Sequence, residues 1–199
     1  QFELDPVTGS LVLDSDGKLW ASEQSYGGVV NFLIKDASNY DESDTYFTEF
    51  RMFDRYAGYN YASGHGAFPN PHDGNLNYGN NQESSSESIN YATALINWGT
   101  YAPVSDAKAI RDAGIYLYTT EGVAIDYYWF DRNDKVFPKE YPHLAASIVW
   151  GSGISQPVWW ETPGSYGDNI EEQHGINILP VNAGSLYLAK NLDYVSDHY

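Results

Sequence analysis

Apolar residues recur at helix-compatible spacing in three segments of the chain. The first is a short stretch from Val29 to Asp36, and the second runs from Ser84 to Trp98, where serines can cap the start and Gly99 is expected to end the helix. The third and longest runs from Asp106 to about Phe130. A last helix is expected to begin near residues 183–185. The pattern predicts a mainly α chain.

The segments between these helices carry many turn-forming residues. Residues 1–20 alternate apolar and polar positions around turn signals, which is typical of a hairpin or a long irregular loop. Residues 54–81 are rich in Gly, Asn, Pro, Tyr and His, and a loop this long in a compact domain is usually functional. Residues 133–182 are again rich in loop-forming residues. We therefore expect long loops and minor β-hairpins beside the helices.

The composition of the chain limits which kinds of molecule it can bind. Hydrophobic residues make up 42% of the 199 residues, which is enough for a packed core. The net charge of -17 repels nucleic acid and anionic membrane surfaces alike. A neutral polymer carries no such penalty, and the aromatic content of 16% suits the apolar faces of sugar rings, although tyrosines also fill ordinary cores. No acidic spacing fits a metal-binding loop, so we expect neither a metal nor a cofactor.

Two glutamates, Glu83 and Glu87, are four residues apart. If one helix includes both, their Cβ atoms lie about 5–6 Å apart on the same face. Like charges so placed repel each other. A pair of this kind is explained if both glutamates bind a common ligand or if one of them stays protonated. Alternatively, Glu87 forms a capping box with Ser84 and Glu83 is merely solvated. Spacing alone favours the capping box.

The string around the two glutamates is more specific than their spacing. Asn81-Gln82-Glu83-Ser84-Ser85-Ser86-Glu87, followed by Trp98-Gly99, resembles the hallmark segment of glycoside hydrolase family 81. Other segments resemble that family in the same order, namely residues 44–53, Asp73-Gly74, residues 141–142 and 146–151, and residues 174–177 and 179–180. The resemblance covers roughly residues 29–199.

Members of this family are endo-1,3-β-glucanases that cleave internal β-1,3 bonds with inversion on an (α/α) barrel. The resemblance implies that Glu83 is the general base and Glu87 a supporting carboxylate. Inversion also needs a general acid about 6.5–9.5 Å away, which the family carries in an Asp-His-His-Phe-His segment that these residues lack. We therefore expect residues 1–199 to form a single domain, the C-terminal portion of a larger (α/α)-barrel catalytic module whose upstream part supplies the acid. The alternative is a non-catalytic glucan-binding or structural relative that has lost the acid.

Aromatic residues are the main candidates for substrate binding. Tyr59 and Tyr61 stand where the family has the His and Trp of a Gly-His-Ser-Trp-Ala motif. Trp159 and Trp160 lie between prolines and glycines, where stacking on sugar rings and core packing both remain open, whereas Trp150 follows an apolar run and is expected in the core. Single aspartates and histidines are more often structural than functional. The residues expected to bind substrate are Asp54, Tyr59, Tyr61, His65, Asp73, Asn81, Trp159, Trp160 and His174.

The partners that follow from the resemblance are a β-1,3-glucan polysaccharide and the remainder of the chain's own catalytic module. Neither nucleic acid nor a membrane is expected as a partner, because of the negative charge. An enzyme of polysaccharide degradation is expected to be extracellular, either secreted or cell-wall associated.

Overall fold

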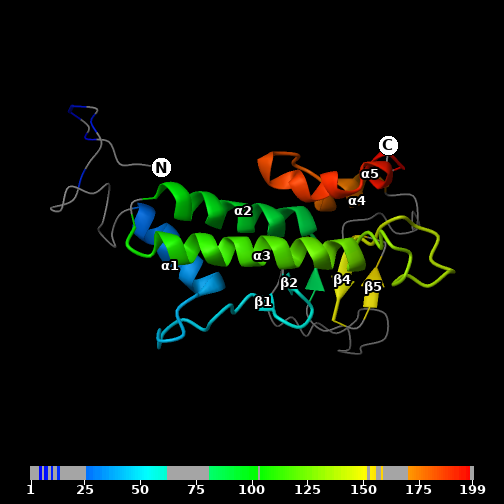
Figure 1. Cartoon of the computed structure of the whole chain (residues 1–199), viewed down its shortest axis with the longest axis horizontal. Coiled ribbons are helices and arrows are strands. Elements are labelled where there is room, and N and C mark those ends of the chain that lie inside the picture. The colour runs from blue at the N-terminus through cyan, green and yellow to red at the C-terminus, as the bar shows by residue number, and fades with distance from the viewer. Residues whose placement is uncertain are drawn as a thin grey trace. The chain divides into compact units, whose positions relative to one another are not determined.

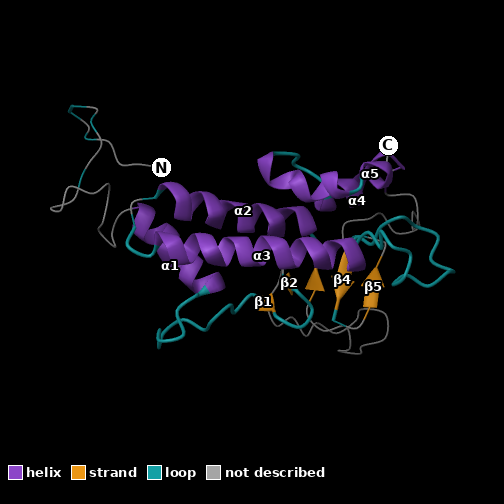
Figure 2. Ribbon diagram, viewed as in Figure 1, coloured by secondary structure: helices purple, strands orange, loops and turns teal. Residues whose placement is uncertain are grey.

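A computed structural model describes most of the chain, namely residues 26–61, 81–102, 104–151, 153–155, 158 and 170–197, together with Asp5, residues 7–8, Ser10 and Leu13. Helices make up most of this described part, as predicted (Figures 1 and 2). The predicted hairpin or loop at residues 1–20 lies almost entirely outside the described residues. The elements in chain order are α1 (Tyr26–Ser38), β1 (Phe53–Asp54), β2 (Tyr59–Asn60), β3 (Asn81–Gln82), α2 (Ser85–Tyr101), α3 (Ala107–Tyr128), β4 (Ile148–Trp150), β5 (Gly153–Ser155), α4 (Ile170–Asn177), the 3-10 helix η1 (Ala183–Lys190) and α5 (Leu192–Asp197).

Each segment that was predicted to be helical is a helix. The first extends beyond its predicted ends at both sides, and the last begins at Ala183 but is a 3-10 helix followed by the short α5. One boundary was wrong, because Gly99 does not end α2, which continues to Tyr101. The chain forms two compact units, one of residues 1–51 with 94–116 and the other of residues 52–93 with 117–199, called here the first and the second unit.

Close packing in the first unit explains why a glycine lies inside α2. A Cβ atom at Gly99 would lie 2.4 Å from the carbonyl oxygen of Ala107 and 2.4 Å from the backbone nitrogen of Arg111, both in α3. No real Cβ atom comes so close to backbone atoms, so the two helices can approach only because residue 99 has no side chain. The neighbouring Trp98 donates its indole hydrogen to Asn31 of α1 at 2.9 Å. Gly99 is therefore a packing residue and not a helix stop.

Replacement of Gly99 with Ala is expected to lower the free energy of unfolding by about 1–3 kcal/mol, because the two helices must separate to admit the methyl group. Urea unfolding measures this loss. Gly175→Ala in α4 is the matched control, since a Cβ atom there meets nothing within 4 Å. Alanine is favoured over glycine in helices by about 1 kcal/mol, so the control is expected to be neutral or stabilising. Equal effects at the two positions would contradict the packing argument.

Two small antiparallel sheets belong to the second unit. Strands β1 and β2 pair with each other, and the second sheet has the order β3-β4-β5. In the second sheet Asn81 lies opposite Trp150 and Gln82 opposite Val149. Strands of two or three residues have too few positions for an alternating pattern, which is why the sequence predicted loops around both sheets. The three-stranded sheet fixes the course of the chain just before Glu83.

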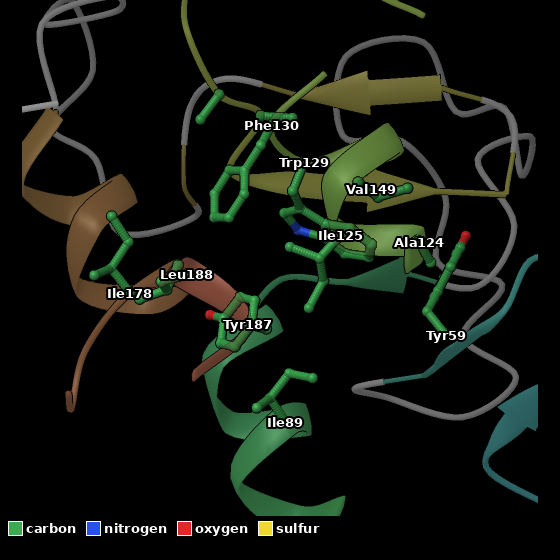
Figure 3. Close-up of a cluster of buried hydrophobic side chains, with 12 residues drawn as sticks. Tyr59, Ile89, Ala124, Ile125, Trp129, Phe130, Val149, Ile178, Tyr187 and Leu188 are labelled. Carbon is green, nitrogen blue, oxygen red and sulfur yellow. The ribbon is translucent and has the colours of Figure 1, made fainter. Parts of the chain in front are cut away.

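The core of the second unit gathers around Ile125 at the C-terminal end of α3 (Figure 3). Trp129 and Ile125 are 0% exposed, and Ile89 of α2 is 1% exposed. Side chains of this size contribute roughly 1.5–3 kcal/mol each when fully buried. Val149 of β4 and Tyr187 of η1 belong to the same cluster. The core thereby joins α3 to the start of α2 and to the strand that pairs with β3.

Candidate active site

Glu83 lies at the junction between a strand and a helix. The strand β3 ends at Gln82 and the helix α2 begins at Ser85, so only two residues connect them. Asn81 and Gln82 are 2% and 4% exposed, whereas Glu83 is half-buried and Glu87 is exposed. The buried strand holds the backbone on one side of Glu83, and the helix holds it on the other.

The three serines of the motif attach the start of α2 to the end of α4. The hydroxyl groups of Ser84 and Ser86 both donate to the carbonyl oxygen of Ile176, each at 2.9 Å. Ser85 donates to the side-chain oxygen of Asn177 at 2.8 Å. The last carbonyl groups of a helix have no partner within the helix, so hydroxyl donors from another element satisfy them. The three serines thus attach α2 to α4, a role beyond capping of α2.

Asn177 connects three segments that are far apart in the sequence. Its side-chain oxygen accepts hydrogen bonds from the backbone nitrogen and the hydroxyl of Ser85, and its amide nitrogen donates to the carbonyl oxygens of Ala146 and Ser147 at 3.3 and 3.4 Å. Its own carbonyl oxygen accepts from the hydroxyl of Tyr187 at 2.9 Å. Asn177 is 1% exposed. Three of the segments on which the family resemblance rests therefore meet at one buried side chain.

The carboxyl group of Glu83 has the properties of a base. Burial raises its pKa above the ordinary value of a glutamate, and the nearby charge of Glu87 raises it further. The oxygen Oε2 is buried and has no hydrogen-bond partner among the described residues. A carboxylate in such surroundings attracts protons more strongly than an exposed one and keeps an acceptor position open. This arrangement can remove a proton from a bound water.

A third carboxyl group, that of Glu121 in α3, contacts Gln82 near the start of the motif and Ser88 directly after its end. It is 0% exposed and accepts hydrogen bonds from the backbone and the side chain of Asn60, at 3.1 and 2.8 Å, and from the hydroxyl of Ser88. The side chain of Gln82 also donates to it. The sequence analysis missed Glu121. Its burial could have been predicted from its position four residues after Leu117, because this spacing places it on the apolar face of α3.

Asp54 and Tyr61, both expected to bind substrate, are bonded to each other. The hydroxyl of Tyr61 donates to Asp54 at 2.6 Å, and the other carboxylate oxygen of Asp54 accepts from the backbone nitrogens of Tyr56 and Ala57. Burial acts to raise the pKa of Asp54, but these hydrogen bonds outweigh it and lower the pKa below its usual value. Asp54 thus shapes the turn between β1 and β2.

Tyr59 is in the core. It is 3% exposed, and its ring makes edge-on contacts with Tyr61, Tyr128 and Trp129 at centroid distances of 6.1, 6.1 and 5.2 Å. Burial raises the pKa of its hydroxyl to about 12. Tyr59 also lines the pocket described below, and its role in an aromatic platform for a sugar stays a prediction.

Asn81 is the first residue of the motif, and His174 lies on α4, the helix to which the serines of the motif are bonded. Asn81 is buried in β3, and His174 is half-buried in α4, where its carbonyl oxygen accepts from the backbone nitrogens of Ile178 and Leu179. Burial lowers the pKa of the His174 imidazole, although the charge of Glu171 opposes this, so the ring is neutral at pH 7. The other candidates, His65, Asp73, Trp159 and Trp160, lie outside the described residues.

A pocket of about 530 Å³ opens beside the three-stranded sheet. Its walls are mainly aromatic and aliphatic, and they include Tyr128, Pro138 and Trp150. Trp150 was expected in the core, but it is only partly buried because it lies at the wall of this pocket. Since Trp150 pairs with Asn81, the pocket borders the strand that leads into the motif.

Two kinds of feature are absent from the part of the chain that the structure describes. No three His, Asp or Glu side chains there come together as a metal-binding group. None of the helices in that part is long and apolar enough to cross a lipid bilayer.

Known proteins resemble this chain over most of its length. A glucan endo-1,3-beta-D-glucosidase from Acetivibrio thermocellus is 46% identical over 180 residues, which are 90% of this chain and 21% of that protein. A protein of the same name from Thermobifida fusca is 36% identical over 191 residues, which are 96% of this chain and 23% of that protein. A solved structure, that of a glycoside hydrolase family 81 protein from Clostridium thermocellum, superposes with a TM-score of 0.75 at 44% identity and covers 90% of this chain and 23% of that one.

The chain spans about a fifth of the length of the relatives that it matches. The family model described as the glycosyl hydrolase family 81 C-terminal domain matches residues 7–199. The resemblance that the glutamate string predicted is thereby confirmed. The chain belongs to glycosyl hydrolase family 81 and matches the C-terminal domain of that family.

Proposed function

We propose that this chain is the C-terminal part of the catalytic module of an endo-1,3-β-glucanase and that Glu83 is its general base. The observation that carries the proposal is the carboxyl group of Glu83, which has a raised pKa and a buried oxygen with no partner among the described residues. Relatives named glucan endo-1,3-beta-D-glucosidase support the reaction and the substrate. Their greater length supports a larger module that includes residues 1–199, for which we propose an (α/α) barrel.

The proposed reaction is hydrolysis with inversion. Glu83 takes a proton from a water as the water oxygen bonds to the anomeric carbon, and a general acid gives a proton to the departing glycosidic oxygen. The acid lies about 6.5–9.5 Å from the base in such enzymes and belongs to a part of the module outside this chain. Glu87 supports the base, because its negative charge raises the pKa of Glu83.

Substrate binding is proposed for the residues around this carboxylate. Asn81 begins the motif, His174 lies on α4, and Trp159 and Trp160 are proposed to stack on glucose rings. A neutral glucan suits a chain with a net charge of -17, since no repulsion arises between them. Because a polysaccharide does not cross a membrane, we propose that the protein acts outside the cell.

The direct test is to incubate the full-length protein with a soluble β-1,3-glucan and follow the products by proton NMR. Inversion predicts that the α-anomer of the new reducing end appears first and then mutarotates. Initial release of the β-anomer would overturn the inverting mechanism but not the substrate. Binding of the glucan without any product would favour a non-catalytic glucan-binding protein instead.

Glu87→Gln is expected to move the acid limb of the pH profile of kcat/KM to lower pH. Glu83 must be unprotonated to act, so activity falls as the pH drops through its pKa, and removal of the neighbouring charge lowers that pKa. Burial still keeps the pKa above the ordinary glutamate value. Initial rates between pH 3 and pH 8 (roughly the range in which carboxyl groups and His titrate) measure the shift. High salt screens the charge of Glu87. It should therefore move the acid limb of the wild-type pH profile to lower pH but leave the acid limb of Glu87→Gln unchanged.

A further inference from the structure

Glu121 makes four hydrogen-bond contacts, two of them with Asn60 and two with residues that flank the segment carrying the two glutamates. Its donors come from β2 through Asn60, from β3 through Gln82 and from α2 through Ser88. Gln82 immediately precedes Glu83, and Ser88 immediately follows Glu87. One buried carboxyl group therefore holds the chain on both sides of the five-residue segment that begins and ends with a glutamate.

The chemistry at this position calls for a carboxylate and not for an amide. Four donor groups from three residues present a hydrogen to Glu121, and an ionised carboxylate has about four acceptor positions and no donor. A glutamine offers acceptor positions on one oxygen only, and its NH₂ group would face the donors of neighbouring residues. Burial raises the pKa of Glu121, and the hydrogen bonds from Ser88, Asn60 and Gln82 act to lower it by favouring the ionised form. The group also interacts electrostatically with the hydroxyl of Tyr187.

Burying a carboxyl group costs free energy that an apolar side chain at the same place does not. What the carboxyl group contributes in return is orientation, because four donors from three elements must point at one place. Glu121 has no exposed surface, so we expect it to make no contact with substrate. Its influence on chemistry must act through Gln82 and Ser88.

We infer that Glu121 is a positioning residue for the proposed base: it fixes the backbone on both sides of the Glu83–Glu87 segment and so sets where the Glu83 carboxylate points. This inference rests on the proposed function of Glu83. A displacement of a catalytic group by about 1 Å can lower a rate a hundred-fold. Substrate affinity, by contrast, depends on other side chains and does not need the base in place.

The test compares Glu121→Gln with Asp126→Asn in the full-length protein. Asp126 lies on the same helix, and its carboxylate pairs with Arg132 and Lys190, away from the motif. Glu121→Gln is expected to lower kcat about 10- to 100-fold with KM unchanged within about two-fold. Asp126→Asn is expected to leave both constants near wild type. Glu121→Asp, which keeps the charge, should recover part of kcat.

Amide hydrogen exchange gives a readout that does not depend on activity. Exchange at Gln82 and Ser88 is expected to accelerate in Glu121→Gln and to stay unchanged in Asp126→Asn. If wild type releases no sugar, the proposed function fails while exchange still decides whether Glu121 positions the segment. Normal exchange, or a kcat for Glu121→Gln no lower than that of Asp126→Asn, overturns the inference. Ser88→Ala, which removes one of the four contacts, takes the place of Glu121→Gln if that variant does not fold.

Discussion

Replacement of Glu83 with Gln is expected to lower kcat on β-1,3-glucan by about a thousand-fold or more. An amide of the same shape cannot accept the proton of the attacking water, and general base catalysis contributes about 10²–10⁴-fold to a rate. Binding should persist, because the side chain keeps its size and its neighbours. Initial rates with a soluble glucan measure the loss, and calorimetric titration with an oligosaccharide measures the retained affinity.

Two controls separate a lost base from a damaged site. Glu140→Gln carries out the same chemical change at an exposed position of the second unit and should leave kcat unaltered. Azide is a nucleophile that needs no deprotonation, so added azide should restore turnover to Glu83→Gln and yield a glycosyl azide of inverted configuration. Near-normal kcat in Glu83→Gln without azide would remove Glu83 from the role of base.

Asn177→Ala is expected to lower the free energy of unfolding by about 3 kcal/mol or more. The change removes both the acceptor of Ser85 and the donor to the carbonyl oxygens of Ala146 and Ser147. Each polar group that is left buried without a partner costs about 1–3 kcal/mol, and the missing side-chain atoms leave a cavity. Denaturant unfolding of the full-length protein measures the loss.

Asn182→Ala is the matched control for this prediction. Asn182 is exposed and caps η1, where its side-chain oxygen accepts from the backbone nitrogen of Gly184 at 2.7 Å. Loss of a cap costs about 1 kcal/mol. A loss for Asn177→Ala no larger than that for Asn182→Ala would contradict the prediction that Asn177 contributes more than an ordinary helix cap.

The helices could be predicted because their apolar periodicity extends over several turns. The segment from Asp106 to Phe130 differs from α3 by only one residue at its start and two at its end. Gly99 could not be placed in the same way, because a glycine after an apolar run usually marks a helix end. The structure shows instead that Gly99 is needed for packing against Ala107 and Arg111 of α3. This contact is between two helices, so the periodicity of α2 alone does not reveal it.

The candidate site was only partly predictable, for a similar reason. Glu83 and Glu87 stood out because a seven-residue string is specific, and the structure adds the burial that raises the pKa of Glu83. The partners of the serines are about ninety residues away, so no local rule connects Ser85 with Asn177. Glu121 escaped notice because a single glutamate in a helix is ordinary until its burial is known.

The bond between Ser85 and Asn177 has a consequence for how the protein is made. A ribosome adds Asn177 to the chain 92 residues after Ser85, and at roughly 5–20 residues per second this separation takes on the order of ten seconds. During that time both glutamates have been synthesised, but the end of α4 that receives the serines has not. A nascent chain that stalls before Asn177 therefore contains the two acidic residues without the hydrogen bonds that attach the start of α2 to α4. The attachment of the glutamate segment to α4 therefore forms only after residue 177 has been synthesised.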